Sequence, residues 1–148
     1  MPEPNLPRPT DAELEILKVL WRRGPSTVRE VFETISETRG TGYTTVLKLM
    51  QIMADKGLVR RDESERAHRY EPTLAEGETQ RQLVGDLLQK AFDGSAKKLV
   101  LQALSSERAS AEELTEIRRL LDELENASVE PESAPGEGLT DGRERSGR

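Results

Sequence analysis

Apolar residues recur at helical spacing in two stretches near the start of the chain, and each stretch opens with the same polar signal. Thr10 is followed by Glu13, and Thr27 by Glu30. In such a capping box the hydroxyl and the carboxylate each accept a hydrogen bond from a free N–H group at the start of a helix. The pattern therefore predicts one helix from about residue 10 to Gly24 and a second from about residue 27 to Gly40.

A third apolar stripe starts near Tyr43 and ends at Lys56-Gly57. A cation in the last turn and a glycine that can turn left-handed are typical of a helix stop. A strand opening at Leu58, a polar turn over residues 62–65 and a returning strand over residues 67–70 are then expected. This succession is typical of a winged helix-turn-helix, a fold used mainly to place one helix in a DNA groove.

The second half of the chain predicts three more helices. They are expected to start at a capping box formed by Thr73 and Glu76, at residue 95, and at a capping box formed by Ser110 and Glu113. The interpretation is a mainly α-helical chain with a small antiparallel β-hairpin, a winged helix-turn-helix followed by a helical dimerisation lobe. Its predicted regions are a flexible arm (1–9), a winged-helix DNA-binding domain (10–72), a helical dimerisation domain (73–126) and a disordered tail (127–148).

The dimerisation label follows from the size of the second lobe. A core built from about 40–60 residues is marginal without help, and oligomerisation is a common form of help. Residues 73–126 are too few to bury three apolar helix faces alone. We therefore expect a homodimer formed through this lobe.

Composition narrows the class of protein. The chain of 148 residues has no cysteine, which removes disulfides, thiolate catalysis and thiolate metal sites. No run approaches the roughly 18 consecutive apolar residues of a membrane span, and the N-terminus lacks a secretion signal. We expect a cytoplasmic protein without direct membrane association, and neither a cofactor nor a bound metal.

The net charge of −6 looks unfavourable for a nucleic-acid partner, but it is unevenly distributed. Residues 1–73 carry 12 basic and 12 acidic side chains, whereas residues 74–148 carry 10 and 16. The acidity therefore lies wholly in the second half. DNA binding requires positive potential where the phosphates lie, not a positive total.

Three ordered motifs resemble the penicillinase-repressor family (BlaI/MecI/CopY-type) over roughly residues 10–105. They are Trp-x-x-Gly-Pro at 21–25, Tyr-Thr-Thr-Val at 43–46 and Lys-Gly-Leu-Val at 56–59. The resemblance implies a dimeric repressor on a pseudo-palindromic operator, relieved by proteolysis linked to a membrane sensor-protease. Copper-responsive relatives use a cysteine cluster, which this chain lacks.

Sequence reading is expected from the start of the third helix, where the predicted DNA-binding residues are Tyr43, Thr44, Thr45, Lys48 and Gln51. Threonine can hydrogen-bond a base edge or touch a thymine methyl, and glutamine can pair with adenine. The structural alternative is that the two threonines cap the helix and the lysine is a solvated cation. Many relatives carry two basic residues where this chain has Gln51 and its neighbour isoleucine.

Phosphate binding is expected at the hairpin and at the start of the second helix. Arg66 lies at the predicted tip, and Ser26 and Thr27 offer backbone N–H groups at a helix N-terminus, a ready anion site. The alternative is that the hairpin arginines pair with carboxylates of the turn itself, which are Asp62, Glu63 and Glu65.

The resemblance also implies a cleavage position. Relatives are cut between an asparagine and a phenylalanine in the short helix, and Gln102-Ala103 occupies that place here.

The rival functional hypothesis is a winged-helix module that binds protein instead of DNA. An enzyme is not expected, because nothing places two carboxylates in a sheltered pocket. Metal binding is not expected at His68, because it is the only histidine and the chain has no cysteine.

Overall fold

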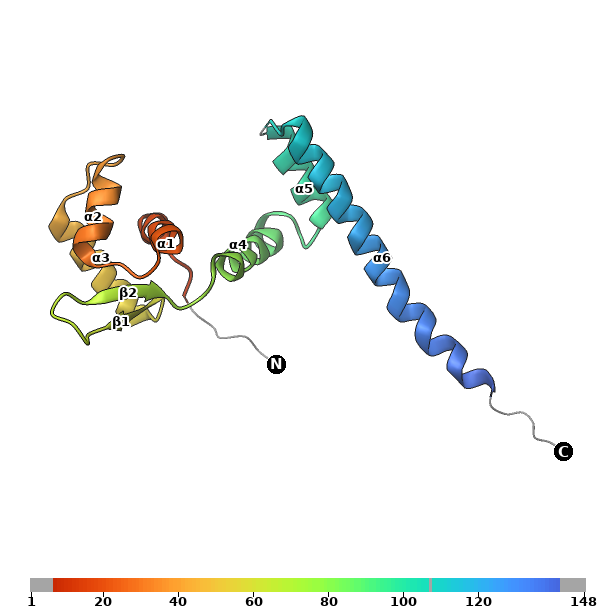
Figure 1. Cartoon of the computed structure of the whole chain (residues 1–148). Coiled ribbons are helices and arrows are strands. Elements are labelled where there is room, and N and C mark those ends of the chain that lie inside the picture. Colours follow the sequence, from red (N-terminus) through yellow and green to blue (C-terminus); the bar gives the residue numbers. More distant parts are fainter. Residues whose placement is uncertain (1–6, 107, 142–148) are drawn as a thin grey trace. The chain divides into compact units, whose positions relative to one another are not determined.

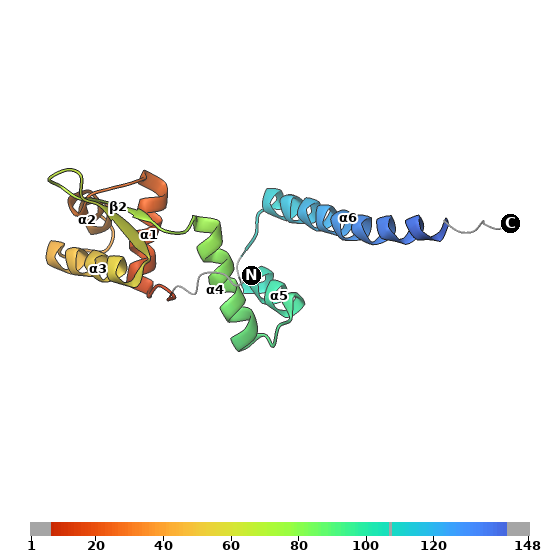
Figure 2. The same cartoon turned by 90° about the horizontal axis from the view of Figure 1, so that it is seen from below.

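The computed structural model describes the backbone of residues 7–106 and 108–141, and the side chains as far as residue 127. The elements are α1 (Asp11–Arg23), α2 (Val28–Ser36), α3 (Tyr43–Lys56), β1 (Val59–Asp62), β2 (Arg69–Pro72), α4 (Glu76–Ala91), α5 (Ala96–Ser106) and α6 (Ala111–Asp141). Figures 1 and 2 show α1, α2, α3 and the hairpin grouped together. The predicted class, mainly helical with one antiparallel hairpin in winged helix-turn-helix order, is confirmed.

Both predicted capping boxes at the start of the chain are present. Thr10 Oγ1 accepts the N–H of Glu13 at 3.2 Å, and Glu13 Oε1 accepts the N–H of Thr10 at 2.9 Å. Thr27 and Glu30 make the same reciprocal pair at 3.2 and 3.0 Å. Helix α3 ends at Gly57, whose φ of 88° is left-handed, as the glycine stop predicts.

The core of the first unit draws apolar side chains from α1, α2, α3 and the hairpin. Its members are Ile16, Leu17, Val19, Leu20, Val28, Val31, Ile35, Val46, Met50, Met53, Leu58, Val59 and Tyr70. One charge is enclosed beside them: Glu13 is only 2% exposed, and Lys56 Nζ donates to its two oxygens at 3.0 and 2.8 Å. This pair joins the start of α1 to the end of α3.

The hairpin is antiparallel, with Val59 opposite Pro72 and Asp62 opposite Arg69. The returning strand starts at Arg69, later than predicted, because the loop takes up residues 63–68. Asp62 stabilises the start of this loop by accepting the N–H of Ser64 at 3.0 Å.

Helix α4 begins at Glu76, so the capping box predicted at Thr73 and Glu76 is wrong. Instead, the N–H of Ala75 donates to Glu78 Oε1 at 2.8 Å. The Thr73 hydroxyl is engaged elsewhere, because it donates to the carbonyl of Gly57 at 2.7 Å. A local sequence pattern does not reveal such a tertiary partner.

The chain divides into two compact units, Met1–Ser95 and Ala96–Arg148. Helix α4 stays with the first unit. Trp21 Nε1 donates to the carbonyl of Leu74 at 3.0 Å, just ahead of α4. Arg8, in the predicted flexible arm, donates from Nη2 to Asp86 Oδ1 at 2.7 Å; residues 1–6 of that arm lie outside the described residues.

The second unit contains α5 and α6. The predicted cap at Ser110 is present, since its Oγ accepts the N–H of Glu113 at 3.0 Å. Helix α6 continues to Asp141, past the start of the predicted disordered tail at residue 127. Residues 142–148 of that tail lie outside the described residues.

Two features of the described residues bear on function, namely the hydropathy of the helices and the exposure of their apolar side chains. No helix within residues 7–106 and 108–141 is long and apolar enough to cross a membrane. Large apolar side chains are nevertheless exposed on α5 and α6, namely Val100, Leu101, Leu104, Leu120, Leu121 and Leu124.

Candidate nucleic-acid interface

An open groove of about 410 Å³ runs between the start of α2, one face of α3 and the hairpin loop. The residues that line it are Thr27, Val28, Arg29, Tyr43, Leu47, Gln51, Arg61, Glu63, Arg66, Ala67, His68 and Tyr70. The groove therefore brings together four predicted site residues from separate parts of the fold, namely Thr27, Tyr43, Gln51 and Arg66. The groove brings the helix expected to read DNA beside the hairpin expected to bind phosphate.

Helix α3 presents the predicted polar residues to solvent: Thr44, Thr45, Lys48 and Gln51 are all exposed. The helix starts after Gly42 without a side-chain cap, so the two threonines do not cap it as the structural alternative proposed. Thr45 is set apart from the others, because it lines a smaller groove on another surface with Ile35 and Arg39. Lys48 makes no ion pair with any described residue.

Three hairpin arginines are paired with carboxylates, but only one of them with a carboxylate of the turn. Arg61 Nε donates to Glu63 at 2.7 Å. The other two reach further, to Glu71 from Arg60 at 3.2 Å and to Glu30 from Arg69 at 3.3 Å. A side-chain hydrogen bond with Tyr70, followed by the contacts with Glu63, raises the pKa of Arg61.

Arg66 differs from these three arginines. It lies in the loop and is exposed, and no described carboxylate pairs with it. Pairing within the turn therefore does not account for Arg66, and its charge is available to a partner.

The anion site predicted at the start of α2 is not available in the expected form. The N–H of Ser26 donates to the carbonyl of Tyr70 at 3.1 Å, in a bridge that adds this segment to the hairpin, and Ser26 is 1% exposed. The N–H of Thr27 donates to Glu30 Oε1. Both N–H groups already have acceptors within the protein, so they are not free to bind an anion as the sequence predicted.

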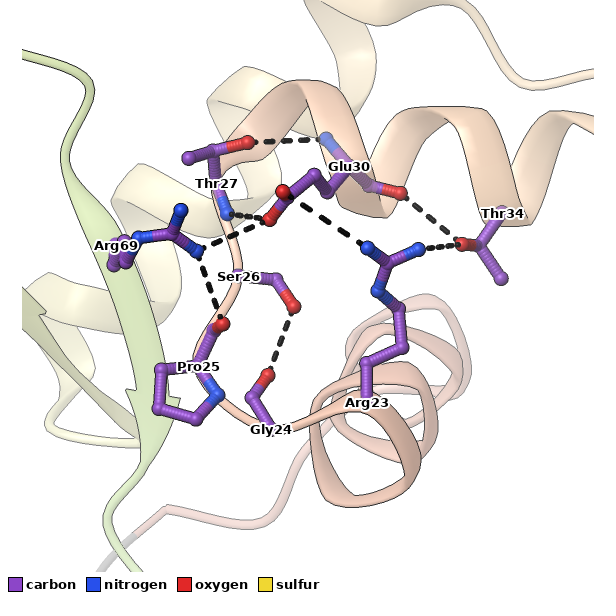
Figure 3. Close-up of polar contacts among 8 residues, drawn as sticks. All are labelled: Arg23, Gly24, Pro25, Ser26, Thr27, Glu30, Thr34 and Arg69. Carbon is purple, nitrogen blue, oxygen red and sulfur yellow. Dashed lines mark hydrogen bonds and ion pairs between the residues drawn. The ribbon is translucent and has the colours of Figure 1, made fainter.

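Glu30 is the centre of the polar contacts at this helix start (Figure 3). Its Oε1 accepts from Arg69 Nη1 at 3.3 Å, and its Oε2 lies 3.9 Å from Arg23 Nη2. Arg23 also donates to the hydroxyl of Thr34 at 3.3 Å. The N–H of Thr27, and then the charges of Arg69 and Arg23, hold the pKa of Glu30 below its ordinary value, although partial burial acts in the opposite direction.

Arg29 is a further groove residue that the sequence reasoning did not select. Its guanidinium carbon lies over the ring of Tyr43, 4.9 Å from the centroid, and 5.9 Å from that of Phe32. The two rings meet edge to face with their centroids 5.6 Å apart. The spacing of Arg29 and Phe32 on one helix face is visible in the sequence, but the approach of Tyr43 from α3 is not.

The predicted cleavage position lies in the second unit. Gln102 and Ala103 are both within α5 and both exposed. Their helical backbone differs from the extended backbone that a protease cleft holds by strand-like pairing, so cleavage requires local unwinding of α5. Whether the chain is cut there stays a prediction.

The sequence profile of one family, described as penicillinase repressor, matches residues 9–123. The chain belongs to the penicillinase repressor family. The resemblance carried by the three motifs is therefore confirmed. Members of this family are transcriptional repressors and not enzymes, in agreement with the expectation from the sequence.

Individual relatives agree with this membership. The transcriptional regulator BlaI of Mycobacterium tuberculosis is 39% identical over 122 residues, which span 82% of this chain and 88% of that protein. The penicillinase repressor of Bacillus licheniformis is 26% identical over 126 residues, or 85% of this chain and 98% of the relative. Among solved structures, the monomeric form of B. licheniformis BlaI in complex with the blaP half-operator aligns with 50% of this chain and 90% of that chain, with 27% identity and a TM-score of 0.45.

Proposed function

We propose that this penicillinase-repressor family member is a homodimer that binds a pseudo-palindromic operator DNA sequence-specifically and represses transcription. The observation that carries the proposal is the polar edge of α3. Its exposed Thr44, Lys48 and Gln51 lie on a helix that lines one groove together with Arg29 and Arg66. Family membership supplies the repressor role, and this surface supplies a way to perform it.

The chemistry of the surface fits a duplex. A recognition helix reads base edges from the major groove with its N-terminal residues, while cations beside it bind phosphates. Thr44 and Gln51 have the donors and acceptors for base edges. Lys48 and Arg66 have no carboxylate partner among residues 7–106 and 108–127, so a phosphate need not displace one.

The exposed apolar side chains of α5 and α6 support the dimer. Leu101, Leu121 and Leu124 are each more than half exposed in the single chain. Exposed apolar clusters of this kind mark interaction surfaces, and a second copy of the same chain would cover them. Two copies would present two recognition helices to half-sites about one helical turn apart.

Repression is then relieved by loss of the dimer. Cleavage at Gln102-Ala103 would separate α6 from the rest of the chain and remove part of the apolar surface. The agent we propose is a membrane metalloprotease sensor. Incubation with such a sensor encoded next to this gene is expected to yield a cut near Gln102, and an intact chain after derepression rules this route out.

Selection of bound sequences from random duplex DNA tests the central proposal. The expected result is a sequence with two-fold symmetry, bound with an affinity that falls steeply with salt. Lys48→Ala and Arg66→Ala should each make the log–log salt slope shallower by about 0.9 for each copy bound, or about 1.8 for the dimer, if the side chain neutralises one phosphate. Arg22→Ala removes the same charge from a surface lined by Lys18 and Thr34, and should leave the slope unchanged.

Two outcomes would end the proposal. A selection without two-fold symmetry contradicts the dimeric operator complex. Binding that does not depend on salt contradicts the phosphate contacts and favours the protein-interaction module instead.

The dimer is tested separately by sedimentation equilibrium. Leu121→Gln with Leu124→Gln should yield a monomer, whereas Arg118→Gln on the same helix should not. A wild-type protein that is monomeric at micromolar concentration contradicts the dimer.

A further inference from the structure

We propose that Arg29 binds a DNA phosphate and that Tyr43 acts on DNA through Arg29, by holding its guanidinium in place, rather than by touching the duplex itself. This inference rests on the DNA-binding function proposed above and adds a positioning device to it. Arg29 was not among the residues predicted from the sequence. Tyr43 was predicted as a DNA contact and here has a different role.

The positioning device consists of three side chains from two helices. Arg29 and Phe32 lie on α2, and Tyr43 is the first residue of α3. The guanidinium carbon is 4.9 Å from the Tyr43 centroid, well within the roughly 6 Å at which a cation over a ring face is attracted. The edge-to-face contact of the two rings, with planes at 80°, keeps the Tyr43 ring from turning away.

The position of the guanidinium suits an external anion. Arg29 is exposed and lines the same groove as Gln51 and Arg66. A guanidinium packed against a ring through its face keeps N–H groups along its edge for hydrogen bonds. Its neighbours Arg23 and Arg69 share the carboxylate of Glu30, whereas no carboxylate within residues 7–106 and 108–127 pairs with Arg29.

A cation without a carboxylate partner in the first turn of a helix is unfavourable in the free protein, because the helix dipole is positive there. The aromatic contact offsets this cost and also limits the rotamers of a long side chain. The Arg29 side chain is therefore partly ordered before an anion binds, and this lowers the entropic cost of binding.

A phosphate fits this guanidinium better than a base edge does. In a helix-turn-helix the first helix of the pair crosses the DNA backbone, while the second lies in the groove. Arg29 belongs to the first of these helices, and its guanidinium lies over the ring of Tyr43 at the start of the second. A guanidinium also matches two phosphate oxygens with parallel hydrogen bonds.

The test uses the full chain with two duplexes, one of fixed arbitrary sequence and one carrying the selected site, between about 50 and 200 mM salt. Arg29→Ala and Arg29→Gln should make the salt slope shallower by about 0.9, and weaken binding about five- to tenfold at low salt, for each copy bound, equally on both duplexes. Arg29→Lys should keep the slope but bind more weakly than wild type, because an ammonium lacks the planar contact. Arg22→Ala is the matched control.

The role of Tyr43 requires its own variants. Tyr43→Phe keeps the ring and should bind like wild type, whereas Tyr43→Leu should bind several-fold more weakly with an unchanged salt slope. Combining Tyr43→Leu with Arg29→Ala should cost no more than Arg29→Ala alone, because the ring acts only through the guanidinium. Circular dichroism melts confirm that each variant is folded at the assay temperature.

The outcomes separate this inference from the proposed function. Wild-type binding without salt dependence contradicts DNA binding itself. Normal wild-type behaviour with an unchanged slope in Arg29→Ala overturns the phosphate contact alone. A loss confined to the selected duplex shows base reading instead, and additive losses at the two positions show that Tyr43 contacts DNA directly.

Discussion

Replacing Glu30 by glutamine tests whether an internal carboxylate restrains arginines that would otherwise bind DNA. Glu30 holds Arg69 at 3.3 Å and lies 3.9 Å from Arg23 (Figure 3). Glutamine keeps the acceptor for the N–H of Thr27, because glutamine also occupies this position of a capping box. The change therefore removes the charge while leaving the helix start in place.

The expected magnitudes follow from these distances. Two unit charges at 3.3 and 3.9 Å attract by about 1.3 and 1.1 kcal/mol in bulk water. Side-chain ordering and solvent screening reduce each contribution to about 0–1 kcal/mol, since the two arginines are each 43% exposed. Glu30→Gln should thus lower the free energy of unfolding by only about 0.5–1.5 kcal/mol. Each arginine released to a phosphate should steepen the salt slope by about 0.9.

The assay is DNA binding by fluorescence anisotropy over a salt series, with urea unfolding in parallel. Glu30→Gln should bind more tightly at low salt and show a slope steeper than wild type by about 0.9–1.8 for each copy bound. Glu33→Gln removes the same charge from the same helix, and no described cation pairs with Glu33; its slope should match wild type. If Glu30→Gln binds more weakly, Glu30 orients the arginines for DNA instead of restraining them, and the reasoning fails.

The stability difference should also depend on pH. The pKa of Glu30 is lowered from its ordinary value of 4.5, first by the N–H of Thr27 and then by Arg69 and Arg23. A lowered pKa in the folded state stabilises the protein above the unfolded pKa, and this contribution is lost as pH falls through the folded one. The stability gap between wild type and Glu30→Gln is therefore expected at about pH 7 and should close as the pH falls below 4.5 and through the lowered pKa of the folded state.

Two further predictions concern the first unit. Lys56→Met leaves the Glu13 carboxylate 2% exposed without a cation and should cost about 2–4 kcal/mol in urea unfolding, most of which Glu13→Gln in the same chain should restore; little loss would show that the carboxylate tolerates burial alone. Gly57→Ala places a Cβ at a φ of 88° and should cost about 1 kcal/mol by the same measurement, whereas an unchanged midpoint would mean that the helix ends equally well without glycine.

Several helix starts and stops were predictable from the sequence because their signals are local, although α2 ends at Ser36, ahead of the predicted Gly40. The boxes at Thr10 and Thr27 and the glycine stop at Gly57 each act within a few residues of themselves. The failure at Thr73 shows the limit of that reasoning. Its spacing to Glu76 satisfied the same pattern, but its hydroxyl is bound by a carbonyl at the end of α3, from another part of the chain.

The candidate site was predictable to the extent that it lies on one continuous element. The polar edge of α3 and the loop arginine Arg66 follow from the order of the elements alone. The use of the Ser26 N–H by the hairpin, the convergence of two arginines on Glu30 and the packing of Arg29 on Tyr43 all depend on contacts between elements. Such contacts between elements cannot be predicted from composition or from the spacing of apolar residues.

The pairing of charges within the first unit sets a limit on how strongly one copy can bind DNA. Three cations of the proposed interface lack a carboxylate partner in the described part of the chain, namely Arg29, Lys48 and Arg66. The arginines at the hairpin and at the end of α1 each have one, namely Arg23, Arg60, Arg61 and Arg69. Three phosphates neutralised by one copy give a salt slope of about −2.7, and two copies on one operator give about −5.4. The measured slope therefore counts the DNA-bound copies: a value near −2.7 on the selected site means that a single copy binds, and a value near twice that means that both do.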